Sequence, residues 1–143
     1  MNKALFFTLL LSVAFLSCQK EEFAPEDYFF SCNINGVEFS RTSVPTNADN
    51  LLEGTLTLTF DQEGKTIIII IDDYSGKGTY SGNYISYDDG AKTHYGQDGL
   101  VEITKLDKKE YIEGTFSGSG EDLSGTSTVS ITEGSFRLKY FEF

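Results

Sequence analysis

The sequence predicts a single all-β domain: an antiparallel β-sandwich or a flattened β-barrel of roughly eight to ten short strands, largely a meander, with no substantial helix. Three observations support this fold class. Polar residues alternate with β-branched or aromatic ones along most of the chain, and no stretch after the first 17 residues keeps apolar residues at helical spacing. Gly, Asn and Asp separate the alternating runs at short intervals. The length of 143 residues suits one hydrophobic core.

The first predicted element is a β-hairpin. Residues 28–34 and 37–42 alternate in polarity on either side of Asn35 and Gly36. An Asn-Gly pair favours a type I′ turn because both residues tolerate positive φ angles. Cys32 shares the apolar side of the first strand, so we expect a small buried side chain rather than a nucleophile.

A second hairpin is expected from residues 55–60 and 65–72, which the turn at 61–64 connects. Its second strand contains five consecutive isoleucines, Ile67 to Ile71. Such a run indicates a central strand that is covered on both faces. The alternative is that one face packs in the core while the other awaits a partner.

The remaining strands follow at shorter intervals. We expect them at residues 78–87, 93–95, 100–106, 111–117, 126–131 and 135–141. Turns are predicted at residues 88–90, 97–99, 107–110 and 132–134. Residues 43–50 are expected to form a longer link to Leu52. Short links favour pairing of neighbouring strands in order.

Composition limits the classes of partner. Hydrophobic residues make up 39% of the chain and charged residues 23%, which is typical of a folded domain. The formal net charge is −11, and no basic cluster is present. Because phosphate contacts supply most of the affinity for nucleic acids, the sequence argues against a nucleic-acid partner.

The amino terminus has the form of a secretory signal peptide. Residues 1–17 contain Lys3, an apolar stretch at 4–16 and the small residue Ser17, which marks the predicted cleavage site. The apolar stretch is too short for a transmembrane helix. We therefore expect residues 1–17 to be cleaved, residues 18–27 to form a lipidated acidic tether, and residues 28–143 to form the β domain.

Phe15, Leu16, Ser17 and Cys18 resemble a lipobox, in which the cysteine receives diacylglycerol and becomes the new amino terminus. Phe15 departs from the pattern, because leucine is commoner there. The resemblance implies lipidation of Cys18, which anchors the chain to a membrane and leaves Cys32 without an intramolecular disulfide partner.

The residues after the cysteine, among them Lys20, Glu21 and Glu22, resemble the short charged export signal of surface-displayed Bacteroidota lipoproteins. That resemblance implies a place on the outer membrane, facing the cell exterior. The alternative is that these charged residues are merely a solvated tether on the periplasmic face.

Candidates for catalysis are few. His94 is the one histidine, and a Ser-His-Asp arrangement would have to recruit Asp88 or Asp89 with one of many serines. No Gly-x-Ser-x-Gly motif is present. One histidine and one free cysteine fall short of a zinc site, and we expect no cofactor.

Acidic turns are weak candidates for calcium. Asp72, Asp73, Asp88 and Asp89 lie close to glycines, and extracellular calcium sites use such carboxylates. The spaced Asp pattern of an EF-hand is absent. Turn aspartates usually cap their own backbone, which is the alternative interpretation, so we predict no metal site.

Tyrosines crowd the middle of the chain and are the best binding candidates. They are Tyr74, Tyr80, Tyr84, Tyr87 and Tyr95. If several lie on one exposed face, they form a rigid amphipathic platform for a glycan or a protein. Alternatively, they pack at the edge of the core with their hydroxyl groups in water.

Several short segments, in this order, resemble a family of small Bacteroidota lipoproteins of uncharacterised function. The segments are residues 30–36 with Phe39, residues 78–80, Gly99 with residues 101–104, residues 114–117 and residues 131–136. All are strand ends and turns. The resemblance therefore implies a shared β fold and supplies no catalytic residue.

These observations favour a surface-exposed cell-envelope lipoprotein that acts as a non-catalytic binding module for an extracellular glycan or an envelope protein. One alternative is a structural or accessory lipoprotein, which would pair through the isoleucine strand or a sheet edge. A small hydrolase with paired carboxylates is the other alternative.

Overall fold

The computed structural model describes residues 28–42, 47–52, 54–107 and 110–142. These residues form nine β-strands and no helix. The strands are β1 (Phe29–Ile34), β2 (Val37–Thr42), β3 (Asn47–Leu52), β4 (Thr55–Gln62), β5 (Lys65–Ile71), β6 (Gly78–Asp88), β7 (Thr93–Asp107), β8 (Tyr111–Asp122) and β9 (Thr128–Glu142). The predicted all-β class is confirmed. In the described ranges, a helix that could cross a membrane is not found.

One strongly curled sheet contains all nine strands, in the order β2-β1-β9-β3-β4-β5-β6-β7-β8. Consecutive strands from β3 to β9 are antiparallel neighbours, as the predicted meander requires. Strand β9 pairs with β8 on one side and with both β1 and β3 on the other. The pairings from β3 to β9 therefore form a ring, and β1 and β2 extend it at one end.

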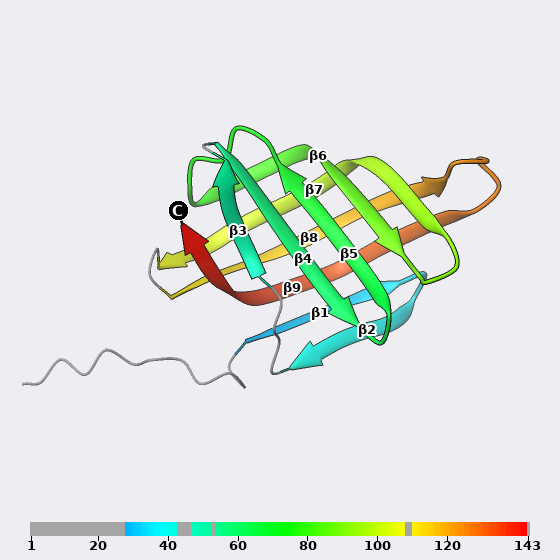
Figure 1. Ribbon diagram of the computed structural model, residues 1–143, viewed down its shortest axis with the longest axis horizontal. Coiled ribbons are helices and arrows are strands. Elements are labelled where there is room, and N and C mark those ends of the chain that lie inside the picture. Colours follow the sequence, from blue (N-terminus) through cyan, green and yellow to red (C-terminus); the bar gives the residue numbers. More distant parts are fainter. Residues whose placement is uncertain (1–27, 43–46, 53, 108–109, 143) are drawn as a thin grey trace, which may run out of the picture.

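The curl stacks two parts of the sheet face to face. In Figure 1, β3, β4 and β5 cross in front of β1, β9, β8 and β7. The sheet is continuous, so the fold matches the flattened-barrel form of the expected architectures rather than two separate sheets.

Inward side chains of this sheet make one hydrophobic core. Phe60 of β4 lies at its centre, with ring centroids 5.4 Å from Phe30, 4.6 Å from Phe116 and 5.7 Å from Phe136. Aromatic pairs at these distances stabilise a core beyond the area that they bury. Cys32 is buried in the same core, as expected, and burial raises its pKa to about 12.

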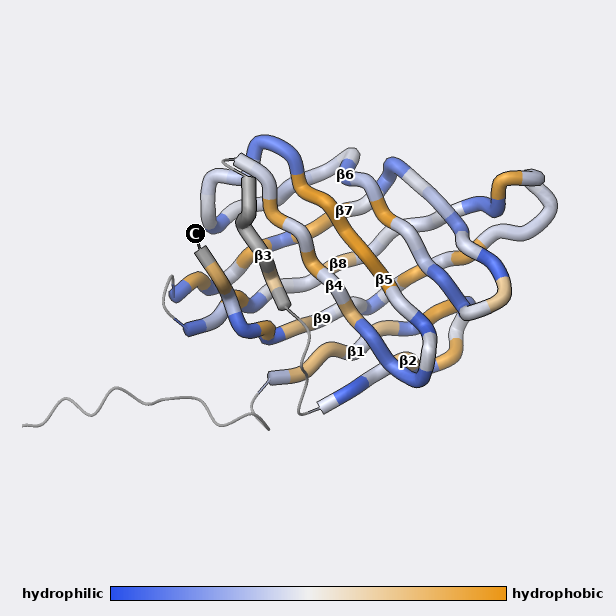
Figure 2. Tube along the Cα trace, in the orientation of Figure 1, coloured by the Kyte–Doolittle hydropathy of each residue, from blue (hydrophilic) through white to orange (hydrophobic). Residues whose placement is uncertain are grey.

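The isoleucine strand does not have two equally covered faces. Ile67, Ile69 and Ile71 are fully buried, whereas Ile68 and Ile70 point outward and are only half-buried. Figure 2 shows β5 as the most strongly hydrophobic strand of the front layer. The expectation of apolar cover on both faces is wrong for the described part of the chain, because only one face of β5 packs in the core. That the outer face awaits a partner stays a prediction.

The first hairpin has the predicted turn. Asn35 and Gly36 have φ angles of 51° and 80°, as a type I′ turn requires. The turn between β4 and β5 repeats this geometry at Glu63 and Gly64, with φ angles of 50° and 78°.

Two predicted turns lie inside long strands. Residues 97–99 belong to β7, where the register with β6 and β8 shifts, and residues 132–134 belong to β9. At the second position Glu133 has a φ of 55°, and a side chain at Gly134 would collide with Phe116. The glycine and the positive φ allow a bend within a continuous strand, so the predicted chain reversal at residues 132–134 is wrong.

The predicted link at residues 43–50 is also incorrect in part, because β3 occupies Asn47–Leu52. Residues 47–50 pair in parallel with residues 139–142 of β9. A parallel pairing between segments so distant in sequence has no local signal, since neither segment shows the turn that announces a hairpin.

Candidate functional site

The outer face of β5, β6 and β7 carries a shallow groove of about 650 Å³. Its lining residues are Gly64, Thr66, Ile68, Tyr84, Ser86, Asp88, Gly90, Thr93 and Tyr95. They share a face because of strand register: Thr66 pairs with Asp88, Asp88 with Thr93, and Ser86 with both Ile68 and Tyr95. The sheet itself thus positions aromatic, aliphatic and hydroxyl groups side by side.

Two of the predicted tyrosines, Tyr84 and Tyr95, come together in this groove. Their ring centroids are 6.3 Å apart with an interplanar angle of 43°. Tyr84 is half-buried and Tyr95 is 39% exposed, so each ring offers part of its surface to solvent. Because both project from paired strands, the strand pairing fixes the positions of the two rings relative to each other.

Hydroxyl groups flank the aromatic pair. The Thr93 hydroxyl donates to Asp88 Oδ2 at 2.9 Å, and the Thr66 hydroxyl donates to Asp61 Oδ1 at 2.6 Å. The backbone N–H of Gly90 donates to Asp88 Oδ1 at 2.7 Å. These bonds orient the polar wall of the groove before any ligand binds.

The other three tyrosines do not reach this groove. Tyr87 points into the core between Phe39 and His94, with centroid distances of 6.4 Å and 6.1 Å. Burial and the nearby charge of Asp89 raise its pKa. Tyr74 is buried and packs on Tyr80 at 5.7 Å. These three therefore pack against the core as the alternative states, but not with all hydroxyl groups in water, because the Tyr74 hydroxyl is buried and the Tyr80 hydroxyl donates to the Gly76 carbonyl. The platform interpretation is kept for Tyr84 and Tyr95.

The candidate calcium ligands lie apart or cap their own turns. Asp89 Oδ1 accepts hydrogen bonds from the backbone N–H groups of Ala91 and Lys92, at 2.8 Å each, which lower its pKa. Asp72 and Asp73 are exposed at the end of β5. Within the described residues, no three His, Cys, Asp or Glu side chains are grouped closely enough to hold a metal ion.

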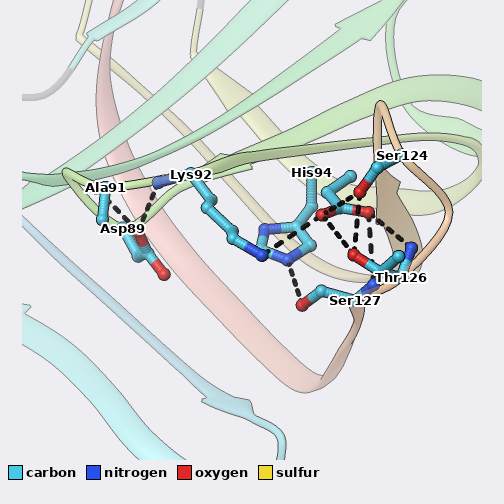
Figure 3. Close-up of polar contacts among 8 residues, drawn as sticks. Asp89, Ala91, Lys92, His94, Ser124, Thr126 and Ser127 are labelled. Atoms are coloured by element: carbon cyan, nitrogen blue, oxygen red, sulfur yellow. Dashed lines mark hydrogen bonds and ion pairs between the residues drawn. The ribbon is translucent and has the colours of Figure 1, made fainter.

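A second polar cluster surrounds His94, which is 5% exposed (Figure 3). Its Nε2 lies 2.9 Å from the Ser127 hydroxyl, so the structure brings the histidine to a serine that its position in the sequence did not indicate. Its buried Nδ1 has no hydrogen-bond partner in the described part of the chain. Neither Asp88 nor Asp89 orients the ring, and the third member of a Ser-His-Asp arrangement is missing from these residues.

Asp122 organises the turn beside His94. Its carboxylate accepts hydrogen bonds from Ser124, Thr126 and Ser127 and pairs with Lys92 at 3.3 Å. Partial desolvation raises its pKa, but these contacts outweigh that effect and hold the pKa well below its usual range. The cluster therefore rigidifies the β8–β9 turn against the β6–β7 turn.

A smaller groove of about 410 Å³ lies over β7, β8 and β9. Exposed Leu100, Glu102 and Glu133 line it together with Thr115 and Gly134. It lacks a tyrosine pair, and Phe116 at its base is 3% exposed. This groove provides matched control positions for the larger one.

Sequence reasoning found the two tyrosines but missed most of the groove. No sequence motif marks the other lining residues Thr66, Ile68, Ser86 and Thr93. The alternation within the isoleucine strand was the available signal, since Ile68 must face outward if Ile67 and Ile69 are buried. Which strands lie beside it depends on long-range pairing.

The predicted anchor residues cannot be placed. The described residues do not include Ser17, Cys18, Lys20, Glu21 and Glu22. Cleavage, lipidation and export therefore stay predictions.

Comparison with known proteins identifies a family and no function. A model described as a domain of unknown function, DUF6252, matches residues 27–138, which is most of the chain and nearly all of the β domain. No curated protein and no solved structure matches the chain. The chain is a member of the DUF6252 family.

Proposed function

We propose that this protein is a non-catalytic binding module of the cell envelope, and that it binds an extracellular glycan in the groove over β5, β6 and β7. The observation that carries the proposal is the outward Tyr84 and Tyr95 pair with hydroxyl groups on either side. Aromatic faces pack on the apolar faces of sugar rings, and neighbouring polar groups bond their hydroxyls.

The groove suits an elongated ligand better than a small metabolite. It is open, and strand residues rather than a closing loop line most of it. Small-molecule sites usually enclose most of their ligand, whereas an open sheet face allows a chain of sugar units to run across several strands.

The sequence supports the location. A lipid on Cys18 would hold the domain at the outer membrane, and the charged residues that follow favour display on the cell exterior. On that face the domain would meet extracellular polysaccharides.

A glycan array, followed by calorimetry with the best binder, tests the proposal on the full chain in mild detergent. We expect Tyr84→Ala/Tyr95→Ala to weaken binding about tenfold or more, because truncating an anchor residue typically costs more than about 1 kcal/mol. The control is Leu100→Ala/Leu123→Ala, which removes two exposed apolar side chains elsewhere. Urea denaturation checks that both variants fold. An unchanged array profile for the tyrosine variant would rule out the groove as the site.

Two observations favour a second candidate, a structural or accessory lipoprotein. Ile68 and Ile70 leave apolar surface on the outer face, and β2 is an edge strand whose Val37 is 70% exposed. Both features suit contact with another envelope protein. Crosslinking in intact cells through a photoreactive residue at Val37 tests this candidate, and recovery of the monomer alone would count against it.

A further inference from the structure

We infer that the groove over β5, β6 and β7 selects glycans that carry amino groups, and that it disfavours anionic glycans. This inference rests on the proposed function. It concerns the charge and the hydrogen-bonding character of the ligand, which the lining residues determine independently of ring stacking.

Inside the groove wall, the threonine hydroxyls donate their hydrogen bonds to aspartate carboxylates. A threonine hydroxyl has one proton. Thr93 donates its proton to Asp88 at 2.9 Å, and Thr66 donates its proton to Asp61 at 2.6 Å. Towards a ligand, both hydroxyls therefore present lone pairs and act as acceptors.

The carboxylates add further acceptors. Asp88 receives one bond from Thr93 and one from the backbone N–H of Gly90, and an ionised carboxylate has about four acceptor positions. Asp88 is half-buried in the groove, and Asp61 is exposed behind Thr66. The groove thus keeps unused acceptor capacity and negative charge where a ligand would sit.

Neighbouring charges reinforce this polarity. On β8, exposed Glu121 pairs in register with Tyr95. Lys65 precedes Thr66 on β5, and strand alternation turns it to the opposite side. Lys92 pairs with Asp122. Among the described residues, Asp88 thus lines the groove, and Asp61 and Glu121 lie beside it. Of the nearby cations, Lys65 points away, Lys92 is paired, and the Arg41 guanidinium donates to the Asp61 carbonyl at 3.1 Å.

Donors in the groove are the hydroxyl groups of Ser86, Tyr84 and Tyr95, which can also accept. A protonated amine donates three hydrogen bonds and accepts none, so it matches the acceptor-rich wall. A carboxylate or sulfate group accepts only and would meet like charge. Uncharged sugar hydroxyls fall between these cases, because they can donate to the same acceptors without a charge.

Three hexasaccharides that share one linkage test the inference: oligomers of glucosamine, glucose and glucuronic acid. Calorimetry uses the full chain in mild detergent and a mildly acidic buffer that keeps the amines protonated. We expect glucosamine hexamer to bind about fivefold more tightly than glucose hexamer, as one or two exposed ion pairs allow. Glucuronic acid hexamer should bind most weakly.

Asp88→Asn should remove most of the preference, measured as the ratio of the affinities for glucosamine and glucose hexamers. The matched control is Glu102→Gln, which makes the same change of net charge in the smaller groove and should keep the preference. Because Asp88 also caps its turn, Asp61→Asn serves as a second variant, with an expected partial loss of the preference.

The outcomes separate the two proposals. If none of the hexamers binds and the array is also blank, the proposed function fails. If glucose and glucosamine hexamers bind equally well, and the tyrosine double variant weakens both, the site stands and the inference is overturned. An equal loss of preference in Glu102→Gln would show a general effect of net charge, which also contradicts the inference.

Discussion

The inner and outer faces of β5 carry the same side chain and have different roles. Ile67, Ile69 and Ile71 are fully buried against the aromatic core, whereas Ile68 and Ile70 lie on the outer face near Tyr84. Burial of an isoleucine stabilises the fold roughly in proportion to the area removed from water. The inner face of this strand therefore supports the fold, and the outer face leaves apolar area partly exposed, which is the area that the proposed ligand would contact.

The two faces also differ in how polar groups are held. In the core, Cys32 is surrounded by apolar side chains that make ionisation unfavourable. On the outer surface, charged residues pair across strands, as Glu113 does with Lys105 and Arg137. The comparison predicts large effects for changes on the inner face and small ones on the outer face.

The largest expected effect is on thiol reactivity. Because burial raises the pKa of Cys32 from 9.0 to about 12, its thiolate fraction at neutral pH is about a thousandfold lower than that of a free cysteine. In a Cys18→Ser background, the native protein should react with a disulfide reagent no faster than it unfolds. Ser31→Cys with Cys32→Ser places a thiol on the other side of β1, where the side chain is half-buried, and this thiol should react much faster than native Cys32. Fast labelling of native Cys32 would contradict the inward placement.

The next effect separates the two faces of β5 directly. Ile69→Ala should lower the free energy of unfolding by about 3 kcal/mol, because it leaves a cavity in the core. Ile68→Ala should cost about 1 kcal/mol or less, since its side chain is only half-buried. Urea denaturation measures both. Equal losses would contradict the outward placement of Ile68.

The smallest effect concerns the outer ion pairs. Partial burial raises the pKa of Glu113, but its bonds with Lys105 and Arg137 outweigh this and keep the pKa below its usual value. Such a group stabilises the fold above its unfolded-state pKa, and the contribution is lost as the pH falls through the lower folded-state pKa. Glu113→Gln should therefore cost about 1 kcal/mol at neutral pH and progressively less in acid. The matched Glu102→Gln variant, at an exposed position, should show almost no change in unfolding free energy at neutral pH.

Local patterns predicted those parts of the fold that depend on neighbouring residues. Asn35 and Gly36 form the expected turn because their φ preferences act within the turn itself. A glycine after a polar residue also predicted a turn at residues 132–134, and that prediction is wrong. There Glu133, with its positive φ, and Gly134 produce a bend inside β9. Nothing within a few residues distinguishes a reversal from a bend, because the distinction depends on whether β1 and β8 pair along the segment.

The candidate site was predictable only in part. Composition and spacing directed attention to five tyrosines, and the structure places Tyr84 and Tyr95 in the groove while it buries Tyr74 and Tyr87. The contact between His94 and Ser127 joins residues 33 positions apart and had no motif. Which side chains share an outer face follows from register, and register is a property of strand pairs rather than of single strands.

By itself, the sequence determined the all-β class and the paired hairpins, since these depend on interactions between residues close together in the chain. Only the structure decided which face of β5 lies in the core, because its five isoleucines are identical. Only the tertiary structure decided that β9 pairs with β1, β3 and β8 and so closes the ring. It also decided that Thr66, Asp88 and Thr93 meet beside the tyrosine pair. The physical reason is that such long-range pairings gain their free energy only when distant strands come together around a common core.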